Sequence, residues 1–154
     1  MRKFVFPIVI IFLIALDQLV KAWTVATIEL DTVRDFIPGL MSLAYLRNYG
    51  AAYSILQHQQ WFFIIVTILV MLGVCYYFIK NINGSLLTLL SLSLIIAGGL
   101  GNFIDRLRLG YVVDMFHLDF INFPVFNVAD ICLTLGVGVL FICIMKEENN
   151  GSKS

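Results

Sequence analysis

Two aspartates in unlike local settings are the residues best suited to carry chemistry in this sequence. Asp114 lies in the segment Tyr-Val-Val-Asp-Met-Phe, with apolar neighbours on both sides. Burial there would penalise the charged form and raise the pKa of the carboxyl. Asp130 ends the segment Pro-Val-Phe-Asn-Val-Ala-Asp, at the start of a long apolar run. Such a pair suits acid–base hydrolysis, in which an ionised carboxylate takes a proton from water and a protonated one polarises the scissile carbonyl.

Each aspartate also has a simpler interpretation. Asp114 could be a loop aspartate placed there by chance. Asn127 is a favourable N-cap residue and Asp130 would stand at N3, so helix capping and the helix dipole can explain Asp130 alone. Covalent catalysis is disfavoured, because no serine, cysteine or lysine nucleophile with an adjacent base is expected near the two aspartates.

An ion pair is expected on the first apolar segment. Asp17 and Lys21 are four residues apart and therefore share one face of a helix. Ionisable groups are costly inside a membrane, which makes them candidates for function. The pair could simply let the helix end near the interface, or it could brace a neighbouring site.

A second polar group follows three glycines, Gly98, Gly99 and Gly101, which would let another helix approach closely. Asn102, Asp105 and Arg106 then share a helix face. An Asp-Arg step could be a helix end that snorkels to the interface. Asn102 would need hydrogen-bond partners inside a membrane helix, and it therefore favours a polar site. The neighbouring Arg106 predicts an ion-paired, structural role for Asp105.

The composition requires a membrane to solvate the chain. The 154 residues are 60% hydrophobic and 13% charged, against about 25% charged residues in soluble domains. Segments of about 20 apolar residues cross the hydrocarbon as helices. The sequence predicts a mainly α membrane protein with one membrane domain over residues 1–154 and four transmembrane helices, at about 4–23, 61–79, 85–105 and 126–145.

The two long connections are expected on the same side of the membrane. Residues 24–60 mix β-branched and aromatic residues with turn signals, which predicts a small β-containing domain on the membrane surface. Residues 107–124 are aromatic and apolar, which predicts an interfacial segment. The opposite side holds both termini and has only two acidic residues, Glu147 and Glu148. Its net positive charge predicts that the termini are cytoplasmic and the loops lie at the outer face.

Several classes of partner are not expected. A net charge of zero without a basic stripe argues against nucleic acid. The histidines and cysteines form no cluster with the spacing of metal ligands, so we predict neither a metal nor another cofactor.

Five segments in order carry a resemblance to a known family: Asp17-Gln-Leu-Val-Lys21, Arg47-Asn-Tyr-Gly-Ala-Ala52, Gly101-Asn-Phe-Ile-Asp-Arg106, Val112-Val-Asp114 and Phe126-Asn-Val-Ala-Asp130. Together they resemble the lipoprotein signal peptidases (signal peptidase II), which are bacterial membrane aspartic peptidases. The resemblance covers essentially the whole chain.

The resemblance implies a reaction and a role for each matched residue. The chain would be an aspartic endopeptidase at the membrane edge that removes the signal peptide of a prolipoprotein before its diacylglyceryl-modified cysteine. It would act in the bacterial cytoplasmic (inner) membrane, with its active site at the outer face and sensitivity to globomycin. Separately from the resemblance, we expect a monomer. The implied roles are catalysis for Asp114 and Asp130, substrate binding for Asn48, Gly50, Asn102, Arg106 and Asn127, and structural support for Asp17 and Lys21, together with Asp105.

Two other functions compete with a peptidase. A transporter or proton relay would spread its acids through the bilayer and interrupt helices near the midplane, whereas residues 61–79 carry no charge. A structural assembly factor would not need Asp114 and Asp130. For the peptidase, we expect residues 48–55 and 111–123 to flank the substrate.

Overall fold

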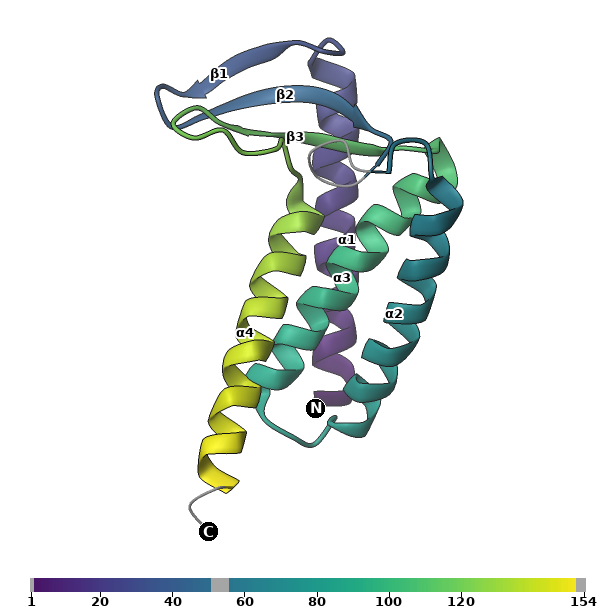
Figure 1. The fold of residues 1–154 in the computed structure, drawn as a ribbon, viewed down its shortest axis with the longest axis vertical. Helices are drawn as coiled ribbons and strands as arrows, with labels where there is room; N and C mark the ends of the chain where they lie inside the picture. Colours follow the sequence, from purple (N-terminus) through teal and green to yellow (C-terminus); the bar gives the residue numbers. More distant parts are fainter. Residues whose placement is uncertain (1, 51–55, 152–154) are drawn as a thin grey trace.

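The computed structural model describes residues 2–50 and 56–151 and combines four long helices with a small sheet. The elements follow in the order α1 (Arg2–Thr27), β1 (Val33–Ile37), β2 (Met41–Asn48), α2 (Gln60–Lys80), α3 (Leu86–Leu109), β3 (Val112–Leu118) and α4 (Val128–Gly151). The helices run side by side and the sheet lies across one end of them (Figure 1). All four helices are long and apolar enough to cross a membrane, which confirms the predicted fold class.

Helix α3 is the centre of the bundle, because α1, α2 and α4 all pack against it. Glycines permit these approaches. A Cβ on Gly98 would clash with the backbone oxygen of Ala129 in α4, and one on Gly136 would lie 2.8 Å from the backbone oxygen of Ser91 in α3. A Cβ on Gly101 would lie 2.8 Å from the carboxylate of Asp17 in α1. The close helix approach predicted from the glycines is therefore present.

The sheet is antiparallel with β2 between β1 and β3. Strand β3 lies in the stretch for which the sequence predicted only an interfacial segment. It pairs with β2 through registers such as Leu46 with Asp114 and Asn48 with Val112. The sequence contains no hairpin signal for this strand, because its partner β2 lies more than sixty residues away. The stretch after it keeps the apolar surface expected of an interface, with Phe120, Ile121 and Phe123 about half exposed.

Three helices extend beyond their predicted ends. Helices α1 and α3 continue for about one more turn, to Thr27 and Leu109, and α4 continues from about residue 145 to Gly151. The sequence interpretation used Lys21 and Asp105 as signs of the interface, but both side chains are buried against each other. Charges that neutralise one another inside a bundle do not mark a helix end.

A cluster of apolar side chains fixes the sheet to the helices. Ile28, Tyr45, Val113 and Met115 pack together at the junction of α1, β2 and β3. Successive side chains of a strand point to opposite faces, so Asp114 projects away from the side on which Val113 and Met115 pack. The sheet thus presents Asp114 towards the ends of α3 and α4 that lie next to it. The ends of α1 and α4 that carry the termini lie far from the sheet (Figure 1).

Candidate active site

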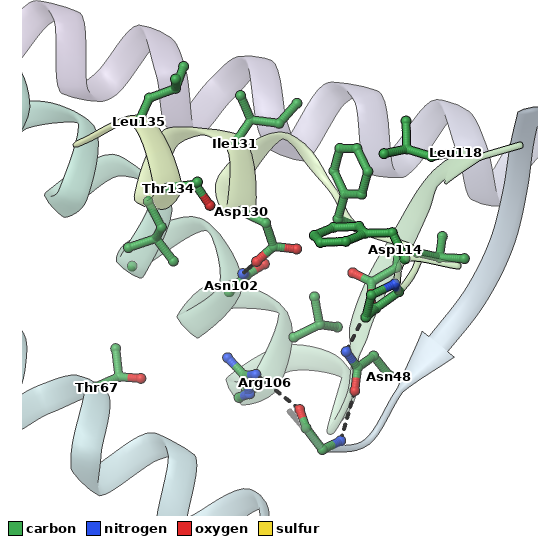
Figure 2. A pocket seen from close by; sticks show the side chains of 18 residues that line it. Asn48, Thr67, Asn102, Arg106, Asp114, Leu118, Asp130, Ile131, Thr134 and Leu135 are labelled. Atoms are coloured by element: carbon green, nitrogen blue, oxygen red, sulfur yellow. Dashed lines mark hydrogen bonds between the residues drawn. The ribbon is translucent and has the colours of Figure 1, made fainter. Parts of the chain in front are cut away.

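A cavity of about 580 Å³ opens beneath the sheet and brings most of the predicted site residues together. Figure 2 shows Asp114 and Asp130 on neighbouring walls of this cavity, with Asn48, Asn102 and Arg106 around them. Helices α2 and α4 also contribute to its walls, through Thr67, Ile131, Thr134 and Leu135. Part of the lining therefore comes from helices that cross the membrane.

Strand β3 places Asp114 in a nearly closed environment, with 3% of the residue exposed. Its Oδ1 accepts a hydrogen bond of 2.7 Å from Asn127 Nδ2, and its Oδ2 accepts one of 2.9 Å from Asn48 Nδ2. Burial raises the pKa of Asp114 to about 7, with a further increase from the charge of Asp130, although these amides and Lys21 lower it. The pKa increase predicted from the apolar neighbours is present.

Asp130 occupies the third position of α4 and takes part in the cap of that helix. The backbone N–H of Asp130 donates to Asn127 Oδ1 at 2.9 Å, and the backbone N–H of Asn127 donates to Asp130 Oδ2 at 3.1 Å. This is a reciprocal capping box, so the simpler interpretation of Asp130 is correct. It does not exclude a site, because Asp130 Oδ1 accepts a bond of 2.8 Å from Asn102 Nδ2 and Asp130 lines the cavity.

Three asparagines aim their side-chain NH₂ groups at the two aspartates. Asn48 donates to Asp114, Asn102 donates to Asp130, and Asn127 donates to both Asp114 and the oxygen of Asn102. Asn127 is fully buried and lies behind the cavity. Every carboxylate oxygen of the pair therefore receives one N–H donor, which leaves acceptor capacity for water or a shared proton.

A buried ionic cluster lies behind Asn102. Lys21 Nζ is 2.9 Å from Asp17 Oδ2 and 3.0 Å from Asp105 Oδ2, so the predicted pair of Asp17 and Lys21 is present. The interpretation that Asp105 pairs with Arg106 is wrong. Consecutive helical residues diverge on the helix surface, and Asp105 instead accepts bonds from Lys21, Gln18 and the backbone N–H of Val113.

Arg106 takes a separate position on the cavity wall. Its Nη2 donates a long hydrogen bond of 3.4 Å to the backbone oxygen of Gly50, and its guanidinium carbon lies 4.9 Å from the centre of the Phe63 ring. The buried Nε of Arg106 has no hydrogen-bond partner among the described residues. The arrangement leaves a cationic donor available at the cavity.

Some polar residues of the site had no clear signal in the sequence. Gln18 Nε2 lies between two carboxylates, 3.2 Å from Asp17 and 2.9 Å from Asp105. Thr67 and Thr134 line the cavity. They lie inside apolar runs, where a single hydroxyl does not indicate a functional site. Of the stretches expected to flank the substrate, residues 51–55 lie outside the described part of the chain. Val112, Leu118 and Phe123 from the second stretch do line the cavity.

The chemistry available here is that of a carboxyl pair with neutral amide donors. Within residues 2–50 and 56–151, no group of three histidine, cysteine or acidic side chains is arranged to hold a metal ion. Two carboxyls in one cavity, with the pKa of Asp114 raised into the neutral range, can activate a water molecule and protonate a leaving group.

Comparisons with known proteins agree on one family. The family model for signal peptidase (SPase) II matches residues 9–146. A lipoprotein signal peptidase of Streptococcus agalactiae serotype Ia is 62% identical over 152 residues, covering 99% of each chain. One from Streptococcus pyogenes serotype M1 is 55% identical, covering 99% of this chain and all of the relative.

Solved structures give the same result. A bacterial membrane enzyme solved by the in meso method at 2.3 Å resolution has a TM-score of 0.89 and 35% identity, covering 95% of this chain and 90% of its own. A second, solved at 1.9 Å, has a TM-score of 0.84 and 36% identity, covering 92% and 93%. With the match over most of the sequence, these similarities confirm the resemblance of the five segments: the chain belongs to the signal peptidase (SPase) II family.

Proposed function

We propose that the chain is an aspartic endopeptidase that removes signal peptides from prolipoproteins, cutting before the diacylglyceryl-modified cysteine. The observation that carries this proposal is the position of Asn127, which binds Asp114 through its side chain and Asp130 through its backbone N–H. One residue thereby holds two carboxyls of unlike environment at the same cavity. Family membership supports the choice of a prolipoprotein as substrate.

The two aspartates divide the proton transfers. Asp114, with a pKa of about 7, carries a proton in a substantial fraction of the molecules at neutral pH, and this form donates it to the oxygen of the scissile carbonyl. Asp130 takes a proton from water as the water oxygen bonds to the carbonyl carbon. The tetrahedral intermediate then collapses. Its C–N bond breaks, Asp130 gives its proton to the leaving amine, and the re-formed carboxyl product returns a proton to Asp114.

The walls of the cavity suit a substrate that arrives through the bilayer. Thr67 belongs to α2, while Ile131 and Leu135 belong to α4, and all three line the cavity within helices of membrane-spanning character. A signal peptide helix and the acyl chains of its lipid-modified cysteine are soluble in the same hydrocarbon. The amide and carboxyl groups of the site lie at the outer end of the helices, where water is available.

The setting of the reaction follows from the charge distribution and the topology. We infer that both termini are cytoplasmic, that the sheet and the aspartates lie at the outer face of the bacterial cytoplasmic membrane, and that the chain forms one membrane domain. Both aspartates and their amide partners come from one chain, which supports action as a monomer. A globomycin-type peptide is the inhibitor that the family membership suggests.

Cleavage of a defined substrate tests the function. The purified full chain would be incubated in lipid with a diacylglyceryl-modified prolipoprotein, beside Asp114→Asn and Asp130→Asn. We expect cleavage before the modified cysteine and losses of about 10²- to 10⁴-fold or more in each variant, the range for general acid–base groups. Asp119→Asn is the matched control, because Asp119 lies just after β3 and binds Ser42 and His117 instead. Full activity in either site variant, or no cleavage by the parent chain, would overturn the proposal.

A further inference from the structure

We propose that Lys21 is a positioning residue for the aspartate pair: it fixes the orientation of the Asn102 amide so that the amide NH₂ donates to Asp130. This goes beyond bracing of the helices and rests on the proposed function, because it concerns the base of that reaction. Lys21 itself does not line the cavity.

The contacts of Lys21 leave it no freedom. Lys21 is 3% exposed, and its ammonium has three donors. These meet three acceptors, Asp17 Oδ2 at 2.9 Å, Asp105 Oδ2 at 3.0 Å and Asn102 Oδ1 at 2.9 Å. Only an oxygen can face the ammonium, so the NH₂ of Asn102 must point the other way, towards Asp130 Oδ1 at 2.8 Å.

The orientation of the Asn102 amide also matches that of the Asn127 amide. Its Nδ2 donates to the oxygen of Asn102 at 3.1 Å and to Asp114 at 2.7 Å, while its own oxygen accepts from the backbone N–H of Asp130. If Asn102 turned over, its NH₂ would face the NH₂ of Asn127 and its oxygen would face a carboxylate. Lys21 on one side and the cap of α4 on the other therefore hold the two amides in one consistent donor direction.

Loss of the Lys21 ammonium would favour the protonated form of Asp130, the proposed base. Without Lys21, only the donor of Asn127 still opposes a turn of the Asn102 amide. The turned amide would present its oxygen to Asp130, which is favourable only when Asp130 carries a proton. Removing a positive charge near two carboxyls acts in the same direction. The charged groups around the pair come from α1, α3, β3 and α4: Asp17, Lys21, Asp105, Arg106, Asp114 and Asp130.

Three variants separate positioning from folding. Lys21→Met leaves the buried Asp17 and Asp105 without their cation, which destabilises the fold. Lys21→Met with Asp105→Asn restores the charge balance. Asp105→Asn alone is the control, since it keeps the contact between Lys21 and Asn102 and retains an oxygen for the N–H of Val113. We expect kcat to fall about 10- to 100-fold in both Lys21 variants that fold, with KM within threefold. Asp105→Asn should retain kcat within about threefold.

A double-mutant cycle tests the route through Asn102. If Lys21 acts through that amide, adding Lys21→Met to Asn102→Leu should lower kcat by less than threefold further. The acidic limb of the pH profile of kcat should move up by roughly one pH unit in the Lys21 variants. Additive losses, or an unmoved acidic limb, would overturn the proposal.

A readout without turnover keeps this inference separate from the proposed function. The infrared band of protonated carboxyls would be titrated in parent and Lys21→Met/Asp105→Asn protein, with Asp130→Asn identifying the Asp130 contribution. We expect that contribution to titrate at higher pH in the Lys21 variant. An unchanged titration would reject the positioning role even if the parent chain cuts prolipoprotein. A shifted titration in a chain that fails to cut would support positioning and reject the peptidase.

Discussion

Asn127 and Asp130 bind each other twice, each through its backbone N–H and the side chain of the other, at 2.9 and 3.1 Å. The start of α4 and the site thus share the same two residues. A change that disturbs the cap also disturbs the carboxyl, so stability and activity are linked at this point of the fold. Variants that keep the cap but remove the amide can separate the two effects.

Asn127→Ser keeps an oxygen for the N–H of Asp130 and removes the NH₂ that binds Asp114. We expect cleavage to fall about 10- to 100-fold while thermal stability changes little, since serine is also a good N-cap. Asn127→Ala should lose as much activity and about 1 kcal/mol of stability in addition. Unfolding temperatures in detergent and cleavage rates, measured on both variants, check this. Equal stability of the two would contradict it.

The pH dependence of stability should show the raised pKa of Asp114. Its pKa is 3.8 when unperturbed and about 7 in the folded chain. Between these values the folded state holds a proton that the unfolded state has released. The contribution of Asp114 to stability is therefore complete below about pH 4 and is lost as pH rises to about 7, at a limit of about 1.4 kcal/mol per pH unit.

Thermal unfolding from pH 4 to pH 8 measures this effect, and Asp114→Asn should remove that part of the slope. The proposed mechanism adds a kinetic counterpart, because Asp114 must be protonated to donate. We expect cleavage to decline above about pH 7. A rate that stays constant to pH 9 would show that Asp114 is not the proton donor.

Gly98 is the point at which α3 can least accept a side chain. In Gly98→Ala the new methyl group would meet the backbone oxygen of Ala129, which cannot move without moving α4. We expect a loss of about 1–3 kcal/mol, as for other overpacked sites, and reduced cleavage because Ala129 precedes Asp130. Gly138→Ala is the matched control, since nothing lies within 4 Å of its Cβ position. Thermal unfolding of both variants distinguishes a packing clash from a general effect of replacing glycine.

Arg106 should bind the substrate, while its neighbour on the last turn of α3 should not. Arg106 lines the cavity, whereas Arg108 is exposed. We expect Arg106→Gln to lower kcat/KM about 10- to 100-fold by removing a charged hydrogen bond to a substrate carbonyl, worth roughly 1.5–3 kcal/mol. Arg108→Gln should stay within about twofold. Similar losses in both variants would indicate an effect of net charge instead of a specific contact.

The sequence was most informative about the fold where a local pattern is compatible with only one or two structures. Long uncharged runs in a chain this apolar can only be membrane helices, and the cap formed by Asn127 with Asp130 follows local rules. Partners that come from distant segments were less accessible. Strand β3 depends on β2 for its pairing, and the pairing of Asp105 with Lys21 requires knowledge of how α1 crosses α3.

The site shows the same division. Asp114 from β3 and Asp130 from α4 line one cavity, as expected for two aspartates that act as a pair. Gln18 had no signal beyond its place in a motif, because a glutamine beside an aspartate reveals nothing of its three acceptors. The catalytic and binding roles of the site residues stay predictions that the substitutions above address.

The share of the cavity wall supplied by α2 and α4 affects how its kinetics must be measured. A substrate that reaches the wall at Thr67 and Leu135 is dissolved in the bilayer, and surrounding lipids compete for the same space. Its relevant concentration is then a mole fraction in two dimensions instead of a molarity. At constant bulk concentrations of enzyme and substrate, added lipid or detergent should slow the reaction by surface dilution. Rates obtained in different micelles or vesicles are comparable only when expressed on that scale.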